Sequence, residues 1–373
     1  MVIDTAPPTL PAAAAPPVPP AAGFFRRHMW WWVGLGLALG STIAGVIVWQ
    51  IQPTDYYAIR PGAVTDTTNI IEIDGIETFD PDGEIGFTTV SILQNITRWE
   101  RRRYDGDPTV TVLHESVING DSTPDEKRVI DRQRMQDSMA VATLVALRYL
   151  GYDVELSGGG AVLLNISEGT PADGVLEVGD VIVMVDDDPI ALSDDLFNAI
   201  RSRAPGDEVE LVIERAGSGD EERVTVVLAE QPEVEGVALL GVEPQTIDLV
   251  ATSPFDISFD IENVGGPSAG LAFTLGVIDV LTPGELTGGA RVATTGAILR
   301  DGTVGPVGGV AQKTVAARQA GADLFIVPST EYEEALTQAG DMPVAMADTV
   351  EEALDVLHDF GGVSLAIGAL GDG

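Results

Sequence analysis

Two short segments of the sequence contain residue types that could together carry out acyl transfer, and the first holds a serine. Ser268 lies in GGPSAG (residues 265–270), which joins a predicted strand to a predicted helix. A serine at a helix N-terminus has free backbone N–H groups and the positive end of the helix dipole beside it. Such donors suit an oxyanion hole, and we expect the N–H groups of Gly266 and Ala269 to contribute. Taken alone, the segment also fits an ordinary serine helix cap.

The second segment holds a lysine. Lys313 follows VGPVGGVAQ (residues 304–312) near the start of another predicted helix, among small and apolar side chains. Burial there would disfavour the ammonium ion and lower its pKa. A general base near pH 7–8 needs a fall of roughly 2–3 pH units from about 10.4, or about 3–4 kcal/mol. The alternative is a surface lysine with a snorkelling stem, but the chain has only one other lysine, Lys127.

A neutral lysine beside a serine hydroxyl can accept its proton, so the two segments predict a Ser–Lys nucleophile pair. A Ser–His–Asp arrangement is weaker, because none of the three histidines (28, 114 and 358) shows a link to Ser268. The chain has no cysteine and no paired-histidine motif, so we expect neither a metal nor a cofactor. A net charge of −38 argues against nucleic acid as a partner.

The elements that must position this pair alternate over residues 255–360, which predicts an α/β domain. Predicted strands cover 257–262, 291–297, 324–327 and 344–347, and predicted helices cover 267–281, 308–320, 331–338 and 350–360. Residues 52–150 contain short alternating runs and then a helical period, which indicates a β-rich region plus a helix.

The N-terminal part predicts a membrane anchor. Residues 1–29 form a Pro/Ala-rich tail that we expect to be disordered and cytoplasmic. Residues 30–51 form an apolar stretch that spans about 33 Å as a helix, enough for a bilayer. A cleaved signal peptide is the alternative, but its apolar region would be shorter. Arg26 and Arg27 precede the stretch, so we expect a single-pass cell-membrane protein whose remaining chain is extracytoplasmic.

Residues 155–230 resemble a bacterial PDZ domain. The matching motifs are GTPADG (169–174) and L-x-x-GDVI (176–182). The resemblance implies that an extended peptide binds by adding a strand to a sheet edge. It also implies that the turn formed by Gly159, Gly160, Ala161 and Val162 presents backbone N–H groups to a terminal carboxylate.

The Ser268 and Lys313 segments together resemble the proteolytic domain of the Lon family, which uses a Ser–Lys dyad. PSAG matches the nucleophile motif, VGGVxxK matches the lysine motif, and Thr295-Gly296 matches a Thr-Gly beside the dyad. The resemblance implies that Thr295 positions Lys313, and it implies hexameric rings. Gly266 and Ala297 depart from the family pattern, which commonly has Asp and Glu there. No P-loop motif occurs, so ATP-driven unfolding is excluded within this chain.

With its anchor, the chain is similar to membrane-anchored PDZ–Lon-like proteins of bacteria, a similarity that includes DYYxxxPG (55–62). We therefore expect a multidomain fold in which a transmembrane helix, the 52–150 region and the PDZ-like domain precede an α/β Lon-like domain at 233–362. The expected function is ATP-independent serine endopeptidase activity on extracytoplasmic proteins or peptides, with the PDZ-like domain recruiting substrate or regulating the site. The alternative is an inactive, membrane-anchored PDZ adaptor.

Overall fold

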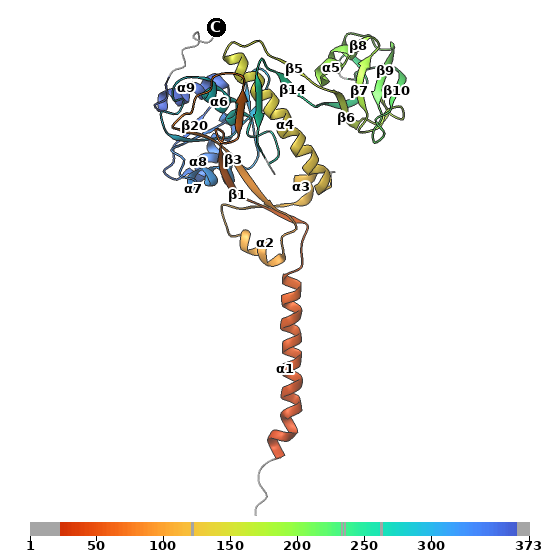
Figure 1. Cartoon of the computed structure of the whole chain (residues 1–373). Helices are drawn as coiled ribbons and strands as arrows, with labels where there is room; N and C mark the ends of the chain where they lie inside the picture. The colour runs from red at the N-terminus through yellow and green to blue at the C-terminus, as the bar shows by residue number, and fades with distance from the viewer. Residues whose placement is uncertain (1–22, 121–122, 233, 235, 262–263, 364–373) are drawn as a thin grey trace, which may run out of the picture.

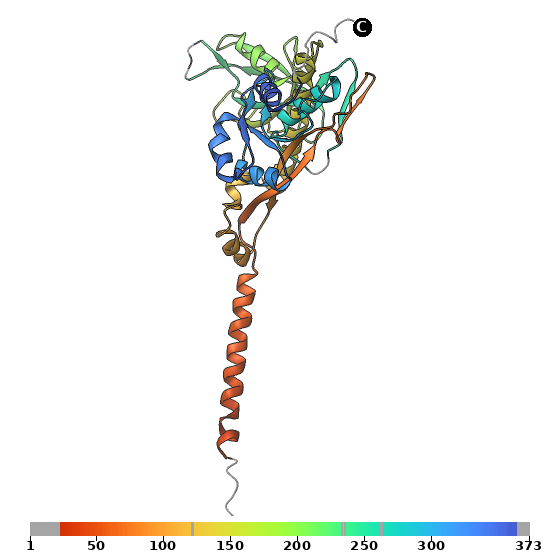
Figure 2. The ribbon, with the colours of Figure 1, turned by 90° about the vertical axis from the view of Figure 1, so that its left-hand side faces the viewer.

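The computed structural model describes residues 23–120, 123–232, 234, 236–261 and 264–363. Its first element, α1 (Gly23–Gln50), extends as a rod away from the folded part (Figure 1, Figure 2). Within α1, Met29–Gln50 is long and apolar enough to cross a membrane, a test that a signal sequence also passes. Residues 23–29 were predicted to belong to the tail but lie in this helix, whereas residues 1–22 are outside the described part.

A six-stranded sheet organises the main folded unit, in the order β20-β19-β16-β3-β1-β4. Its strands are β1 (Tyr56–Asp66), β3 (Glu84–Leu93), β4 (Thr111–His114), β16 (Arg291–Thr294), β19 (Leu324–Val327) and β20 (Val344–Met346). Strands β3, β16, β19 and β20 are parallel, whereas β1 runs antiparallel to β3 and β4. The ranges 52–150 and 233–362, which the sequence analysis treated separately, therefore contribute strands to one sheet.

Helices cover both faces of this sheet, as the side chains of β19 demonstrate. Leu324 and Ile326 belong to the core formed with α4 (Pro124–Tyr149), α6 (Gly270–Leu281) and α9 (Val350–Phe360). Phe325 and Val327 belong to the opposite core, under α7 (Val310–Gln319) and α8 (Tyr332–Ala339). Burial on both faces explains why the strand is an unbroken apolar run, as is typical of parallel sheets.

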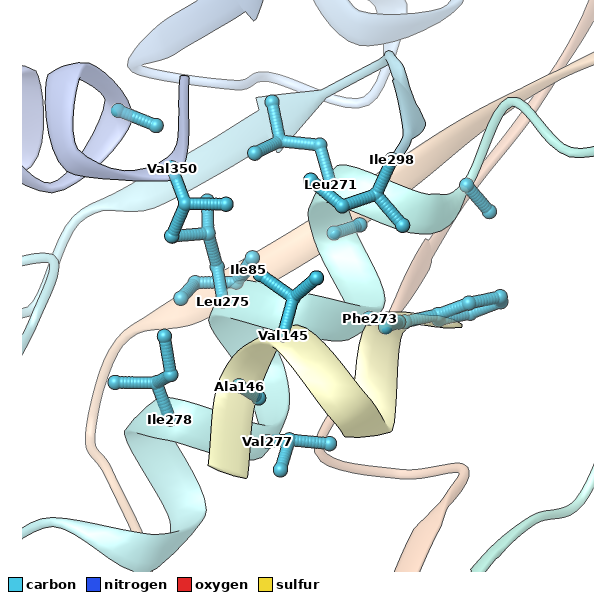
Figure 3. Close-up of a cluster of buried hydrophobic side chains, with 14 of the residues drawn as sticks. Ile85, Val145, Ala146, Leu271, Phe273, Leu275, Val277, Ile278, Ile298 and Val350 are labelled. Atoms are coloured by element: carbon cyan, nitrogen blue, oxygen red, sulfur yellow. The ribbon is translucent and has the colours of Figure 1, made fainter. Parts of the chain in front are cut away.

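Helix α6 lies at the centre of the larger core. All of its residues are buried, which fits a helix that is apolar on every side. Figure 3 shows Val145 and Ala146 of α4 packed beside α6, with Val350 of α9 and Ile298 lining the same cluster. Because α4 comes from residues far upstream in the chain, this packing ties the upstream region to the helix that follows Ser268.

A second unit has its own sheet, in the order β10-β9-β7-β6-β13, and stands to one side in Figure 1. Its elements are β6 (Gly160–Ile166), β7 (Val181–Val185), β8 (Asp188–Pro189), α5 (Ser193–Arg201), β9 (Glu208–Glu214), β10 (Glu221–Val227) and β13 (Val242–Ile247). Leu163, Ile182 and Leu211 are fully buried in a separate hydrophobic cluster. Strands β5 (Glu155–Ser157) and β14 (Val250–Thr252) pair with each other where the chain enters and leaves this unit.

The remaining elements are short. They are β2 (Ile71–Asp74), α2 (Arg98–Tyr104), α3 (Glu115–Asn119), β11 (Ala229–Glu230), β12 (Ala238–Leu239), β15 (Asp256–Phe259), β17 (Ala297–Ile298), β18 (Val304–Gly305) and the 3-10 turn Ser329–Glu331. Strand β15 pairs with β2, and β17 pairs with β18 beside the start of α6.

Candidate active site

The segment that carries Ser268 is a tight turn placed before α6. The helix begins at Gly270, so Ser268 lies two residues outside it and not in its first turn. Gly266 has a φ of +90°, a backbone conformation that side chains with a Cβ rarely adopt. The Gly-Pro pair therefore sets the path of the chain into the turn, which leaves Ser268 half-buried at the amino end of a long apolar helix.

Gly270 allows this turn to pack closely against its neighbours. A Cβ at Gly270 would lie 2.6 Å from Ile298 Cγ2 and 2.9 Å from Ser138 Oγ. The Ser138 hydroxyl donates a hydrogen bond to the Pro267 carbonyl at 3.1 Å, so α4 holds the peptide unit directly before Ser268. Ser138 was not among the predicted site residues, although a serine among the apolar residues that α4 buries is a signal visible in the sequence.

Thr295 connects the serine segment to the lysine. It follows the carboxyl end of β16, and its hydroxyl accepts a hydrogen bond from Lys313 Nζ at 3.1 Å. The same hydroxyl donates to the Ser268 carbonyl at 3.3 Å, and the next backbone N–H, of Gly296, donates there at 3.0 Å. Helices α6 and α7 lie on opposite faces of the sheet, and their amino ends meet at the end of β16.

Lys313 is buried, with 3% of its surface exposed. Burial away from water lowers the pKa of its ammonium group to about 8, and the nearby negative charge of Glu331 opposes this effect only in part. Thr295 Oγ1 is the one hydrogen-bond acceptor that Nζ has among the described residues. An amine with this pKa is partly neutral near pH 7–8 and can accept a proton.

Ser268 and Lys313 line the same groove, which has a volume of about 900 Å³. No direct hydrogen bond joins the two side chains within the described part of the chain, but the Thr295 hydroxyl connects Lys313 Nζ to the Ser268 backbone carbonyl. Catalytic hydrogen bonds are often long or absent without substrate and tighten when it binds. The groove is also lined by Met135 and Met139 of α4 and by Phe259 of β15, which makes much of its surface apolar.

The two predicted oxyanion donors differ in the structure. The Gly266 N–H donates to the Asp131 carbonyl of α4 at 2.7 Å, so it is already satisfied, contrary to our expectation. The reason is the close approach of α4, because a Cβ at Gly265 would lie 2.9 Å from the Asp131 Cβ. The Ala269 N–H has no such acceptor among the described residues, so it stays a prediction.

The predicted peptide-binding turn of the second unit is occupied by the chain itself. Ala161 and Val162 lie inside the sheet, because β6 pairs with β7 on one side and with β13 on the other. The Gly159 N–H donates to the Ile247 carbonyl, and the Gly160 N–H donates to the Ala191 carbonyl. These groups are therefore not offered to a peptide, and the open sheet edge near α5 is β13 instead.

The two units are in contact through side chains. Gln245 of β13 donates to the Asp137 carboxylate of α4 at 2.8 Å. Arg300 forms an ion pair with Asp194 in the first turn of α5. The open edge strand of the second unit thus touches the helix whose next residue, Ser138, holds the turn before Ser268.

Family models match both units. Residues 148–228 match the PDZ domain, and residues 263–358 match the Lon protease (S16) C-terminal proteolytic domain. The two domains are therefore present, as the resemblances implied. The sequence-based domain ranges were 155–230 and 233–362, but the exact boundaries of the folded domains stay a prediction.

Curated relatives match the proteolytic part. The chain is 33% identical over 116 residues to Lon protease 2 of Bacillus subtilis (strain 168), covering 31% of this chain and 20% of that protein. It is 34% identical over 101 residues to the peroxisomal Lon protease homolog 2 of Caenorhabditis elegans, and the match covers 26% of this chain and 13% of that protein. The chain thus spans a fifth or less of the length of these relatives.

Two solved structures are similar to part of this chain. The PDZ domain of the SdrC-like protein from Listeria monocytogenes is 22% identical, with a TM-score of 0.21, and the match covers 23% of this chain and 86% of that one. A solution structure from Geobacillus thermodenitrificans is 28% identical, with a TM-score of 0.20, and the match covers 22% of this chain and 95% of that one.

Proposed function

We propose that this chain is a membrane-anchored, ATP-independent serine endopeptidase that uses Ser268 as nucleophile and Lys313 as general base. One observation carries the proposal: Lys313 is buried, has a pKa of about 8, and lines the same groove as Ser268. The hydrogen bonds of Thr295 to Lys313 and to the Ser268 segment support its role as a positioning residue.

In the proposed reaction, neutral Lys313 accepts the Ser268 hydroxyl proton while Oγ attacks a peptide carbonyl. Backbone N–H groups at the start of α6, including that of Ala269, stabilise the oxyanion. Lys313 then protonates the leaving amine, which leaves an acyl ester on Ser268. A water molecule attacks this ester, its proton passes to Lys313, and Ser268 is released with its hydroxyl proton restored.

The proposed location rests on α1. Its apolar stretch, Met29–Gln50, fits a bilayer, and Arg26 and Arg27 stand on its N-terminal side. The bias of basic residues toward the cytoplasm supports a topology with the N-terminus inside and both folded units outside. Protein or peptide substrates would then be met at the outer surface of the cell membrane.

The PDZ unit is proposed to bind an extended peptide along β13. This strand ends the sheet, and it lies beside α5, where the Ser193 N–H donates to the Thr246 hydroxyl at 2.9 Å. Added strands obtain affinity from main-chain hydrogen bonds, which an edge strand can provide. Through the Gln245–Asp137 hydrogen bond, the occupied edge would also touch α4.

The test uses the full chain in detergent or nanodiscs, incubated with an unfolded protein and without ATP. We expect the wild type to cleave it and Ser268→Ala and Lys313→Ala to lose at least a thousandfold in rate, since each removes a reacting group. Ser218→Ala, at an exposed turn of the PDZ unit, is the matched control and should cleave normally.

Each outcome has a distinct meaning. Cleavage that survives Lys313→Ala would reject the proposed base while leaving a protease. A wild type that cleaves no substrate but still binds peptide would favour the adaptor alternative, in which the function of the chain is peptide binding by the PDZ unit.

A further inference from the structure

The groove that holds Ser268 and Lys313 has a charge balance opposite to that of the whole chain. The sequence contains 58 acidic and 20 basic residues, nearly three acids for every base. Among the described residues, the groove is lined by four of those bases and by a single acid, Asp131. A strongly acidic chain thus has a groove whose described lining contains a single acidic side chain.

The excess of bases comes from one wall, the first half of α4. The lining residues are Lys127, Arg128 and Arg132, of which Arg128 and Arg132 have the i,i+4 spacing that places side chains on one helix face. Lys127 forms an ion pair with Asp131, and Arg128 forms one with Asp125. Arg132 is exposed and forms no ion pair or hydrogen bond with any residue that the structure describes.

Arginines without an ion pair also occur elsewhere in the described part of the chain, but Arg132 is the one among them that lines the groove. Guanidinium groups bind carboxylates through two parallel hydrogen bonds, a geometry that a flexible lysine does not reproduce. The neighbouring walls are largely apolar, with Met135, Met139 and Phe259 facing the same space. A ligand that matches this lining has apolar side chains next to one or more carboxylates.

We propose that the groove selects acidic peptide segments and that Arg132 is the specificity-determining residue, pairing with an Asp or Glu side chain near the scissile bond. This rests on the proposed peptidase function. It names the substrate class of that same groove. Because the net charge of the chain is −38, general electrostatics disfavour acidic peptides, and the pair with Arg132 supplies a local attraction in the groove that holds Ser268 and Lys313.

The test compares three peptides that share an apolar centre and a dye and differ only in the flanking residues: Asp/Glu, Asn/Gln or Lys. Both ends are capped by acetyl and amide groups, so that no terminal carboxylate engages the PDZ unit. Binding is measured by fluorescence anisotropy on full-chain Ser268→Ala in nanodiscs of neutral lipid. Cleavage is measured separately on the full chain with Ser268 intact.

We expect the acidic peptide to bind about fivefold tighter than its amide twin at low salt, in line with a partly screened ion pair. Arg132→Gln should remove this preference, Arg132→Lys should keep part of it, and Arg132→Glu should shift it toward the Lys peptide. Arg134→Gln is the matched control, because Arg134 is exposed on the same helix but does not line the groove.

Equal binding of the acidic and amide peptides to the groove with Arg132 intact would overturn the proposal. A loss of preference in Arg134→Gln as large as that in Arg132→Gln would also overturn it, because it would indicate a general charge effect. An acid preference that depends on Arg132 in a chain that cleaves nothing would support the groove's selectivity and reject the peptidase function. The two proposals therefore fail in distinguishable ways.

Discussion

Replacing Lys313 by methionine should stabilise the folded protein while abolishing its proposed activity. In the folded state burial lowers the lysine pKa from 10.5 to about 8. A difference of about 2.5 pH units corresponds to about 3 kcal/mol that folding loses at neutral pH. Methionine has a similar volume and carries no charge, so the substitution removes this penalty.

Part of the gain is offset by the lost hydrogen bond between Lys313 and Thr295, worth about 1 kcal/mol. Thr295 keeps its bond to the Ser268 carbonyl, so its hydroxyl is not left without a partner. The net expectation at pH 7 is a stabilisation of about 2 kcal/mol. For a unit of this size it raises the melting temperature by about 4–8 °C.

The sign of the pH dependence follows from proton binding. The lysine pKa is lower in the folded chain, so between about pH 8 and 10.5 the unfolded chain binds more protons at this site. The wild type therefore gains stability relative to the variant as the pH rises through this window, and the penalty is complete below about pH 8. Near pH 10.5 only the lost hydrogen bond remains, so the variant should be the less stable protein.

The assay is urea unfolding of the full chain in detergent, followed by far-ultraviolet circular dichroism between pH 6 and 10.5. Taking the difference between the two proteins cancels the titration of every other group that the substitution does not touch. A methionine variant that is less stable at pH 7, or a difference that stays constant from pH 7 to 10.5, would refute the reasoning. Either result would mean that burial does not disfavour the protonated form of Lys313 in the folded chain.

Three further outcomes follow from the same structure. The kcat/KM for peptide cleavage should rise with pH and level off above an apparent pKa near 8, because neutral Lys313 is the reactive form; a profile that is flat from pH 6 to 9 would contradict this. Gly266→Ala should cost about 1–2 kcal/mol in unfolding free energy and lower kcat more than it changes KM, because its φ of +90° is strained for alanine. Asp279→Asn should stabilise the fold above pH 7, because burial raises the pKa of Asp279 to about 7 and one of its oxygens has no hydrogen-bond partner. The folded pKa of Asp279 lies above the unfolded value of 3.8, so the wild type loses stability as the pH rises from about 4 to about 7. The asparagine side chain of the variant does not titrate, so its stabilising effect should be absent below about pH 4. Denaturant titrations at several pH values measure this difference.

Much of the proteolytic unit could be predicted from local patterns. The predicted strand at 324–327 and the predicted helix at 350–360 coincide with β19 and α9, because both have strong apolar patterns and clear ends. The start of α6 was predicted three residues early, since Pro267 favours a helix start while the positive φ of Gly266 and the turn at Ser268 delay it. The motifs around Ser268 and Lys313 pointed to the proteolytic domain, and the motifs at 169–174 and 176–182 pointed to the PDZ domain, both of which the family models match.

Long-range packing decided the features that the sequence analysis missed. Strand pairing depends on contacts between distant residues, so nothing local indicated that β3 joins β16, or that β13 takes the edge beside β6. The position of α4 also depends on contacts between distant residues, and this position allows the Asp131 carbonyl to accept a hydrogen bond from the Gly266 N–H.

The sequence by itself determined which residues could react, because the serine and lysine motifs depend only on residue type and spacing. Only the tertiary structure decided how strongly the lysine is desolvated and which helix forms the wall opposite it. Both depend on the side chains that fold around the site: Lys313 is 3% exposed because α7 packs against the sheet, and Arg132 faces the groove because α4 crosses α6. The pKa of a buried group and the shape of a groove both depend on many neighbouring residues, and these residues come together only when the chain folds.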